Sequence, residues 1–363
     1  MNYKPTIGTS INDLNTPCLI IDLTNLEHNM NHIKEFYSDK TSKLRPHSKN
    51  HKTPAIAHLQ INTGGTVGGV CASKVSEAEV MVDSGIKSIL ITSEIVDVNK
   101  IKRMNLLAKR SEINVAIDDF NNAEEISKQA SQENVNIGLI IEIETGMNRC
   151  GVQTPEMALN LAKSIMKLPN ITFKGLMSHQ TINGVPDLEE RSLEAHKTIA
   201  KVIESKELIE QNNINVDIIS TGETWSYDVA ASIPGVTEIQ GGSYLMMETD
   251  YHYMSEFAYS AKILATVTET QYSNTAILNV GMKHISILKG VPIIQFPKGC
   301  EIVNMDTIST TISTKGIDVG IGDQVILLPS QQDAMVSRWN EFIGVRDGLV
   351  ENIWDITARG CIS

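Results

Sequence analysis

Short apolar, β-rich runs recur along the first two thirds of the chain, and each ends in a polar or glycine-containing turn. Eight such runs occupy residues 43–48, 67–71, 88–92, 114–117, 138–143, 173–178, 216–220 and 236–240. Segments with helical spacing and capping residues separate them, for example residues 73–85 and 121–132. Eight alternating β/α units favour a closed parallel (β/α)8 barrel, a TIM barrel, over the alternative of an open doubly wound sheet.

The pattern changes after Tyr251, where strands joined by polar turns replace the β/α alternation. The expected strands read YSAKILATVTETQ, TAILNV, ISILKG, QVILLP and LVENIWDITARG. An earlier apolar run, TPCLIIDL at residues 16–23, precedes the first barrel strand and is assigned to the same all-β region. We therefore predict an α/β barrel domain at residues 24–253 and a β-rich domain formed by residues 1–23 and 254–363.

Charge and composition narrow the class of partner. The chain has 363 residues, is 41% hydrophobic and carries a formal net charge of -12. A strongly acidic chain disfavours nucleic acid and anionic membranes as partners, because binding their phosphates needs a basic surface. A local basic pocket for one small anion remains compatible with this charge.

The cysteines and the N-terminus indicate the compartment. The five cysteines are scattered and form no CxxC pair, which is typical of free thiols in a reducing environment. The N-terminal residues contain no apolar run of the signal-peptide kind, and no stretch approaches the ~20 apolar residues that span a bilayer. These features predict a cytoplasmic protein without a membrane anchor.

The end of the first barrel strand carries the densest group of reactive side chains, in the segment LRPHSKNHK at residues 44–52. If the strand continued, Arg45, His47, Lys49 and His51 would share one face. Cations that converge on one pocket disfavour one another's ionisation, and a free lysine amine is what Schiff-base chemistry requires. The alternative interpretation is a solvated basic strand end.

Two further side chains follow barrel strands at the carboxyl end, where barrel enzymes place their active sites. Arg149 lies in the turn ETGMNRCG after the fifth strand, and His179 ends the sixth. The alternative for Arg149 is an ordinary ion pair with Glu142 or Glu144. The alternative for His179 is a core histidine bonded to a backbone carbonyl.

Glycine turns follow the seventh and eighth strands, at residues 220–224 (STGET) and 240–244 (QGGSY). Barrel enzymes commonly bind phosphate with these two loops, because backbone N–H groups bind an anion without needing a lysine. A phosphate site opposite Lys49 suits pyridoxal phosphate (PLP). It suits a sugar-phosphate aldolase that uses a lysine Schiff base equally well.

The motifs also resemble a known family. TPCLIIDL, LRPHSKNHKTPAIA, GGVCASKVSEAEVM, ETGMNRCGV and VTEIQGGSY occur in the order found in fold-type III PLP enzymes. The resemblance covers nearly the whole chain and is greatest to the D-threonine aldolase and D-serine dehydratase branch, whose barrel is related to the N-terminal domain of alanine racemase. The histidine-lysine block is quite specific, whereas the glycine turns are not.

The resemblance implies a role for each site residue. It assigns the Schiff base to Lys49 rather than Lys52, and places Arg149 near the 3′-oxygen of PLP and His179 near its ring. It assigns the phosphate to Thr221, Gly222, Gly242 and Ser243, next to Tyr244. Gln240 takes the place where alanine racemases carry an arginine facing the pyridine nitrogen, so that nitrogen is less reliably protonated here.

Relatives in this branch also bind a divalent metal through a His-x-Asp or His-x-Cys pattern after a Pro-Ser or Pro-Asn step. The corresponding stretch here is PSQQDAM, in which Asp333 holds the second ligand position and Gln331 replaces the histidine. An amide oxygen is a poor ligand for zinc but acceptable to hard ions. The resemblance therefore implies loss of the metal or a hard ion such as Mg2+ or Mn2+. Asp333 as a plain turn residue is the alternative.

The function that follows is a PLP-dependent lyase acting on β-hydroxy D-amino acids, with retro-aldol cleavage to glycine and an aldehyde preferred. The expected catalytic residues are Lys49, Arg149 and either His47 or His51 as general base. A D-serine dehydratase-type ammonia-lyase, an amino-acid racemase or epimerase using Tyr259 or Tyr272, and a non-catalytic PLP carrier are the alternatives. The β-rich domain disfavours the carrier, and relatives use that domain to complete the site, often across a homodimer.

Overall fold

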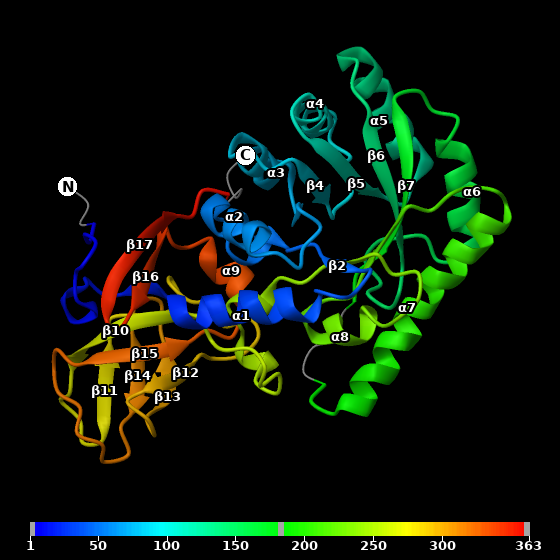
Figure 1. Cartoon of the computed structure of the whole chain (residues 1–363). Coiled ribbons are helices and arrows are strands. Elements are labelled where there is room, and N and C mark those ends of the chain that lie inside the picture. Colours follow the sequence, from blue (N-terminus) through cyan, green and yellow to red (C-terminus); the bar gives the residue numbers. More distant parts are fainter. Residues whose placement is uncertain (1–3, 181–184, 359–363) are drawn as a thin grey trace. The chain divides into compact units, whose positions relative to one another are not determined.

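The computed structural model describes residues 4–180 and 185–358. The chain divides into two compact units, coloured along the sequence in Figure 1. The barrel unit comprises Ile33–Lys49 and Pro54–Gly242. The β unit comprises Met1–His32, Asn50–Thr53 and Ser243–Cys361. Helix α1 (Leu23–Phe36) begins in the β unit and ends in the barrel unit.

The barrel unit contains an eight-stranded parallel sheet. Its order is β2-β9-β8-β7-β6-β5-β4-β3. Bridges pair Leu44 with Thr66 and His47 with Cys71, and they join the two end strands so that the sheet closes. The strands are β2 (Lys43–Leu44), β3 (Val70–Ala72), β4 (Ser88–Ile91), β5 (Glu112–Ile117), β6 (Ile137–Ile143), β7 (Ile171–Ser178), β8 (Ile218–Thr221) and β9 (Glu238–Ile239).

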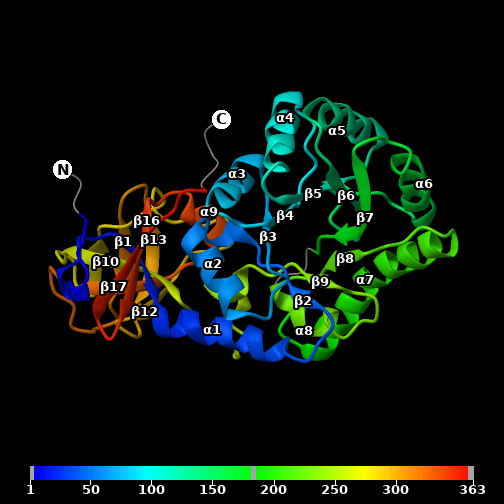
Figure 2. The same cartoon turned by 45° about the horizontal axis from the view of Figure 1, so that its top comes forward.

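Helices surround these strands on the outside, as Figure 2 shows. Helices α3 and α5 occupy the two segments with predicted helical spacing, although α3 begins after Lys74 and α5 after Asp119 rather than at the first residue of each segment. Asp119 accepts amide hydrogens at the start of α5, and Thr154 does so before Pro155 in α6. The helices are α2 (Pro54–Thr63), α3 (Val75–Asp83), α4 (Val98–Leu107), α5 (Phe120–Glu133), α6 (Pro155–Ile165), α7 (Leu188–Gln211) and α8 (Tyr227–Ala230).

The interior of the barrel is a packed apolar core. Five fully buried side chains from consecutive strands form it, namely Cys71, Leu90, Ala116, Ile140 and Met177. Side chains alternate across a strand, so residues two positions earlier on these strands also face inward, nearer the amino-terminal end. The core therefore separates the two ends of the barrel, as expected for this fold.

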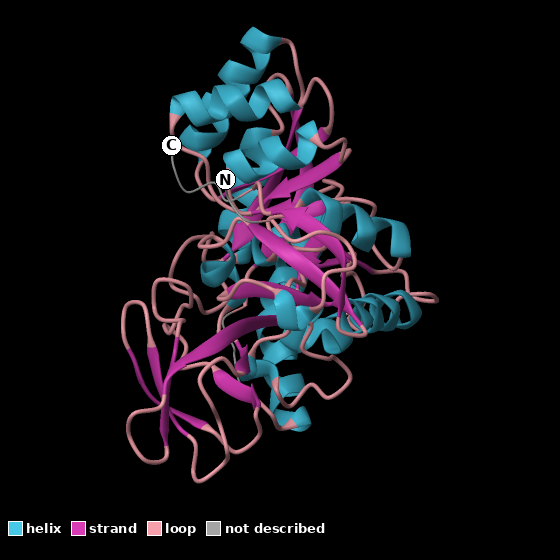
Figure 3. Cartoon of the chain, turned by 90° about the vertical axis from the view of Figure 1, so that its left-hand side faces the viewer, coloured by secondary structure: helices cyan, strands magenta, loops and turns pink. Residues whose placement is uncertain are grey.

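The β unit is a nine-stranded, mostly antiparallel sheet, seen as magenta strands in Figure 3. Strand β1 (Cys18–Asp22) pairs antiparallel with β10 (Ala261–Glu269) and parallel with β16 (Glu341–Arg346). The other strands are β11 (Thr275–Leu278), β12 (Ile293–Phe296), β13 (Glu301–Met305), β14 (Thr310–Ser313), β15 (Gln324–Leu328) and β17 (Leu349–Asp355). One short helix, α9 (Gln332–Val336), follows β15.

The predicted barrel and the separate β-rich region are confirmed, and all eight expected barrel runs contain a strand. Three details of the prediction are wrong. The first barrel strand ends at Leu44 rather than at residue 48, and the stretch ISILKG forms turns instead of a strand. Strands β12, β13, β14 and β16 were not anticipated.

The structure also bears on the predictions about the cysteines and about membrane-spanning segments. The four described cysteines, Cys18, Cys71, Cys150 and Cys300, are free, as predicted, while Cys361 lies outside the described residues. Within residues 4–180 and 185–358, no helix has both the length and the apolar character needed to cross a bilayer.

Candidate active site

Lys49 lies just beyond the carboxyl end of β2, in a 3-10 helix spanning Ser48–Asn50. Its side chain is half-buried. After burial, the positive charge of Lys49 is the next largest cause that lowers the pKa of His179, so the two side chains are close enough to interact electrostatically. The predicted strand alternation around Lys49 is wrong, because the helical turn replaces the strand, and the role of Lys49 stays a prediction.

Arg45 does not join Lys49. Its guanidinium donates to Glu238 through Nε, 2.7 Å from Oε2, and to Ser88 Oγ at 3.2 Å. Both partners of this ion pair are almost fully buried. Arg45 directly follows β2, and its side chain contacts the first residues of β9 and β4, Glu238 and Ser88. The expected basic face of four residues is therefore not formed.

His47 and His51 repeat one local arrangement. The Nδ1 atom of His47 accepts the amide hydrogen of Lys49 at 3.3 Å, and that of His51 accepts the amide hydrogen of Thr53 at 3.1 Å. The Nε2 atom of His47 is 3.2 Å from the hydroxyl of Thr92, which itself donates to a carbonyl and so accepts from the ring. Both ring nitrogens of His47 are thereby occupied, and the geometry suits holding the backbone of Lys49 better than accepting a proton.

His179 follows β7, as predicted, and pairs with a carboxylate rather than with a backbone carbonyl. Its Nε2 is 3.2 Å from Glu223 Oε1, in the loop after β8. Burial, together with the positive charges of Lys49 and Arg149, lowers the pKa of His179 to about 3. A neutral imidazole, oriented by Glu223, is therefore the resting form of this side chain at ordinary pH.

Arg149 lies in the turn after β6 and is half exposed. Its Nη2 is 3.6 Å from Glu142 Oε1, so the simple ion pair considered as an alternative does form. Its Nε donates to Cys150 Sγ at 3.3 Å, and that thiol donates to Glu142 Oε1 at 3.1 Å. Arg149 also influences His179 electrostatically. The ion pair and a position at the barrel opening are thus compatible.

Two neighbouring carboxyl groups, of which Glu142 is buried, lie next to this arginine. The ligand atoms of Glu94, Glu142 and Cys150 all lie within 4.8 Å of one another. Burial and the neighbouring charge of Glu94 raise the pKa of Glu142 to about 7, and burial raises the pKa of the Cys150 thiol to about 12. Glu142, the Cys150 thiol and Arg149 therefore form one hydrogen-bonded network, in which burial favours the proton on Glu142.

The loop after β8 contains the first glycine turn. Thr221 ends the strand, and its hydroxyl is 2.6 Å from the hydroxyl of Ser178. Gly222 has a φ of 78°, and a Cβ at this position would lie 2.7 Å from the Cβ of Ala230. Only glycine suits such a conformation and such close packing, so a side chain is excluded at this point of the loop.

Gln240 follows β9 and is almost fully buried. Its Nε2 donates to the hydroxyl of Ser220 at 3.1 Å, while its Oε1 has no hydrogen-bond partner among the described residues. Buried polar atoms are rarely left unpaired. The free acceptor is the observation that best suits a bound group here, such as the ring nitrogen of the implied cofactor.

The remaining phosphate residues divide between the two units. Gly242 is the last residue of the barrel unit, while Ser243 and Tyr244 open a 3-10 helix, Ser243–Leu245, in the β unit. Within the β unit, the hydroxyl of Ser243 donates to Glu248 Oε1 at 3.3 Å and accepts from the amide of Asn50 at the same distance. Burial raises the pKa of Glu248 to about 7.

The candidate metal ligands lie at the start of α9 in the β unit. Gln331 is the residue before the helix, and its Oε1 accepts a hydrogen bond from Ser286 at 3.1 Å. Asp333 has a buried Oδ1 with no hydrogen-bond partner within the described parts of the chain. The backbone carbonyl of Asp333 accepts a hydrogen bond from Lys52 Nζ at 3.0 Å. The amine of Lys52, the second lysine of the basic block, is therefore already hydrogen-bonded.

Several partners of the site were not foreseen. Glu223 and Thr92 each bond to a predicted residue, yet each lies on a different strand or loop from its partner. Their position in the sequence was the available signal. Both lie just after the carboxyl end of a barrel strand, where the same rule selected Arg149 and His179.

Comparison with known proteins agrees with this geometry. Residues 21–249 match the family model described as alanine racemase, N-terminal domain. The 3-hydroxy-D-aspartate aldolase of Paracoccus denitrificans (strain Pd 1222) is 30% identical over 97% of this chain and 94% of its own length. The D-threonine aldolase of an Arthrobacter species is 32% identical over 97% of this chain and 95% of its own length.

A solved structure gives the same result. The crystal structure of D-threonine aldolase from Filomicrobium marinum is 30% identical, covers 99% of this chain and all of its own, and has a TM-score of 0.94. The family model covers more than half of the sequence, and relatives of at least 30% identity extend over nearly all of it. The chain therefore belongs to the alanine racemase N-terminal domain family, in the branch that contains the D-threonine and 3-hydroxy-D-aspartate aldolases.

Proposed function

We propose that this protein is a PLP-dependent lyase that cleaves β-hydroxy D-amino acids to glycine and an aldehyde. The observation that carries the proposal is the half-buried lysine just beyond the carboxyl end of β2, near His179, in a chain related over nearly its full length to two aldolases. When bound, the cofactor supplies an electron sink for the carbon left by bond cleavage.

The barrel residues suit that cofactor. Lys49 would be the attachment point, with Arg149 and His179 available to its ring. Backbone amides at Gly222 and Gly242, with the hydroxyls of Thr221 and Ser243, would hold the phosphate. Gln240, whose Oε1 has no partner among the described residues, would be available to the ring nitrogen, and Tyr244 would follow the second phosphate turn.

His47 and His51 act in this proposal by position. Each takes an amide hydrogen two residues further along the chain, so together they hold the backbone on both sides of Lys49. His179 stays neutral because its pKa is about 3, so it orients the cofactor by hydrogen bonding and does not add a positive charge.

The β-unit residues suit a hard divalent ion better than zinc. Asp333 offers a buried carboxylate oxygen without a partner among the described residues, and Gln331 offers an amide oxygen that already accepts a hydrogen bond. Oxygen donors favour Mg2+ or Mn2+, and the absent histidine weakens zinc. Manganese titration followed by electron paramagnetic resonance should detect one bound ion that Asp333→Asn loses.

The proposal extends to the assembly of the protein and its compartment. We infer a homodimer, because relatives complete their site with the β-rich domain across such an assembly; light scattering at several concentrations measures it. Free thiols at all four described cysteines support a reducing compartment such as the cytoplasm.

Product analysis tests the activity. The holoenzyme, incubated with D-threonine, D-serine and 3-hydroxy-D-aspartate, should release glycine and an aldehyde from at least one of them. Release of a keto acid and ammonia instead would identify a dehydratase, and exchange of the Cα hydrogen with solvent without cleavage would identify a racemase.

Lys49→Ala should abolish both the cleavage and the absorbance of bound cofactor. Lys52→Met is the matched control. The Nζ atom of Lys52 donates to Asp333 O at 3.0 Å and to Ser337 Oγ at 2.6 Å, so it is already engaged in the β unit. This control should keep the cofactor absorbance.

A further inference from the structure

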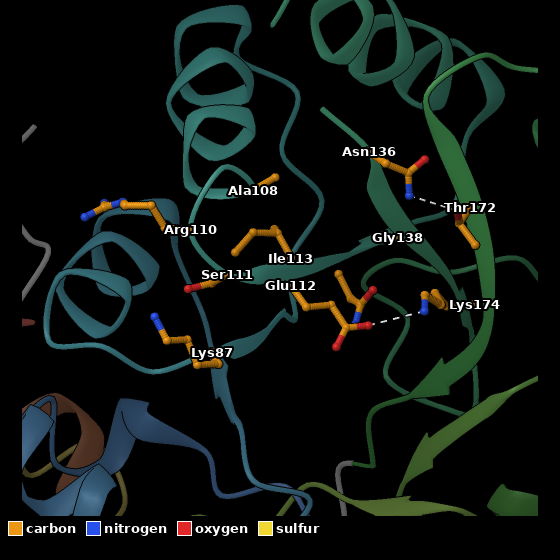
Figure 4. Close-up of a pocket in the computed structure, with 11 residues that line it drawn as sticks. Lys87, Ala108, Arg110, Ser111, Glu112, Ile113, Asn136, Gly138, Thr172 and Lys174 are labelled. Carbon is orange, nitrogen blue, oxygen red and sulfur yellow. Dashed lines mark hydrogen bonds and ion pairs between the residues drawn. The ribbon is translucent and has the colours of Figure 1, made fainter. Parts of the chain in front are cut away.

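A second polar pocket lies at the amino-terminal end of the barrel strands. It has a volume of about 420 Å3 and is shown in Figure 4. We call it the barrel-floor pocket and define it by Lys87, Arg110, Glu112, Asn114, Asn136 and Lys174. Lys87 precedes β4, Glu112 begins β5 and Asn136 precedes β6, whereas Lys49 follows the carboxyl end of β2. The pocket and the proposed active site are therefore at opposite ends of the barrel unit.

Asn114 is the unusual member of the barrel-floor pocket. It is 1% exposed, and neither its Nδ2 nor its Oδ1 has a hydrogen-bond partner among the described residues. It lies two positions before Ala116, which belongs to the barrel core, so its side chain also faces inward. A buried amide with two unpaired polar atoms is costly and usually has a partner.

The neighbouring strand leaves room for this amide. Asn114 is paired with Gly138 on β6. A Cβ at Gly138 would lie 1.8 Å from Asn114 Oδ1, so any other residue would displace the side chain. The combination of an inward amide and a facing glycine keeps a donor and an acceptor available at the inner wall of the pocket.

The rim of the pocket is cationic in a chain whose net charge is -12. Figure 4 shows Lys87 and Arg110 on one side of Glu112 and Lys174 on the other. The Lys174 amine is 3.3 Å from Glu112 Oε1, and Arg110 is 2.6 Å from Asp83 Oδ1. Lys87 has no ion-pair partner in the described residues, so one lysine charge at the rim is uncompensated.

We propose that the barrel-floor pocket binds a small organic anion, a carboxylate or phosphate ester that also carries a hydroxyl or amide group. Lys87 and Lys174 attract the anionic group at the rim. The neutral group reaches inward and pairs with the unpartnered amide of Asn114. This site is separate from the proposed active site and does not depend on the cofactor or on the aldolase reaction.

Calorimetric titration of the PLP-loaded enzyme tests this proposal, since the cofactor then occupies the phosphate loops at the other end of the barrel. The probes are glycerol 3-phosphate and glycerate, which carry an anion and hydroxyls, together with inorganic phosphate and glycerol. We expect one of the first two to bind more tightly than phosphate or glycerol. Comparing those two distinguishes a phosphate ester from a carboxylate.

Two variants and a control separate the two contacts. Asn114→Leu keeps the shape of the side chain and should weaken the preferred probe by about tenfold, the effect of one lost hydrogen bond, without changing phosphate binding. Lys87→Met should weaken every anion, whereas Lys128→Met, an exposed lysine on α5, should change none. All three should retain aldol cleavage.

Equal affinity of the wild type and Asn114→Leu for the preferred probe would overturn the proposal. So would a failure of both glycerol 3-phosphate and glycerate to bind at millimolar concentration. Lys87→Met lies at an exposed position and provides the second test should Asn114→Leu fold poorly; unchanged anion binding in this variant would likewise contradict it.

Discussion

The two ends of the barrel satisfy their polar groups in different ways. At the carboxyl end, His179 pairs with Glu223 and Arg149 pairs with Glu142, while burial lowers the pKa of His179 and raises that of Glu142. At the amino-terminal end, the cations lie at an exposed rim and the buried amide of Asn114 has no partner among the described residues. The first arrangement is typical of a preorganised reaction site and the second of a site that awaits a ligand.

The buried ion pair between the two ends gives the largest expected effect. Arg45→Met removes the partner of Glu238, whose side chain is only 7% exposed, and leaves a buried charge unpaired. Such a change lowers the free energy of unfolding by about 3–5 kcal/mol. Urea denaturation measures the change. The double variant Arg45→Met/Glu238→Leu should recover most of the loss, and equal stability of the single and double variants would contradict this account.

The network beneath Arg149 gives the next largest effect, and it depends on pH. Glu142 has a pKa of about 7 in the folded protein, against a usual value of 4.5, because burial and Glu94 disfavour its charged form while Arg149 and the Cys150 thiol partly compensate. Between these values the unfolded chain has already lost the proton that the folded protein keeps. Stability is therefore full below about pH 4.5 and falls as the pH rises to about 7, by on the order of 2 kcal/mol.

Glu142→Gln should remove that pH dependence. Urea denaturation at about pH 4.5 and about pH 8 compares the two proteins over the window of this titration. The wild type should lose more stability across the window than the variant. Parallel losses in both would show that Glu142 does not hold its proton at the carboxyl end of the barrel.

A smaller effect is expected for His179. Because its pKa is about 3, the ring is neutral throughout the usual assay range, so its replacement changes a hydrogen bond and not a charge. His179→Asn should lower kcat/KM by about tenfold, the loss of one such bond, with an unchanged pH profile. Disappearance of a limb of the pH profile would mean that His179 titrates during the reaction.

The smallest effect belongs to the opposite end. Asn114→Leu replaces an unpaired buried amide by an apolar side chain of similar shape, which should leave stability unchanged or raise it by about 1 kcal/mol. Thermal unfolding of the variant measures it. A marked loss of stability would mean that the Asn114 amide is bonded in the folded protein, and the contrast between the two ends would no longer hold.

The sequence predicted the barrel well because each strand is an apolar run, and the carboxyl-end rule then selected Lys49, Arg149 and His179. The prediction failed where the local sequence pattern does not determine which way a side chain points. The 3-10 turn at Ser48–Asn50 ends the alternation on which the grouping of Arg45 with Lys49 relied. Sequence gave no account of Glu223, because its partner His179 follows a different strand and only the folded sheet brings the two together. The pair of Arg149 with Glu142 was among the alternatives, because both lie in or directly after one strand.

Strand patterns in the β unit were less informative. Strands β12 and β13 have exposed as well as buried positions, so their alternation is weak, and β16 lies beyond a short helix. Asn114 had a modest signal in sequence, as one amide inside an apolar strand. Its meaning appears only with Gly138 opposite, a pairing that the register of β5 and β6 creates.

Chemical trapping of the cofactor tests the central claim most directly. Borohydride reduction of the holoenzyme, followed by proteolysis and mass spectrometry, identifies the lysine that carries PLP. We predict a single modified peptide, with the added mass on Lys49. Modification of Lys52 or of any other lysine in its place would contradict the assignment of Lys49 as the cofactor-bearing residue at the barrel opening.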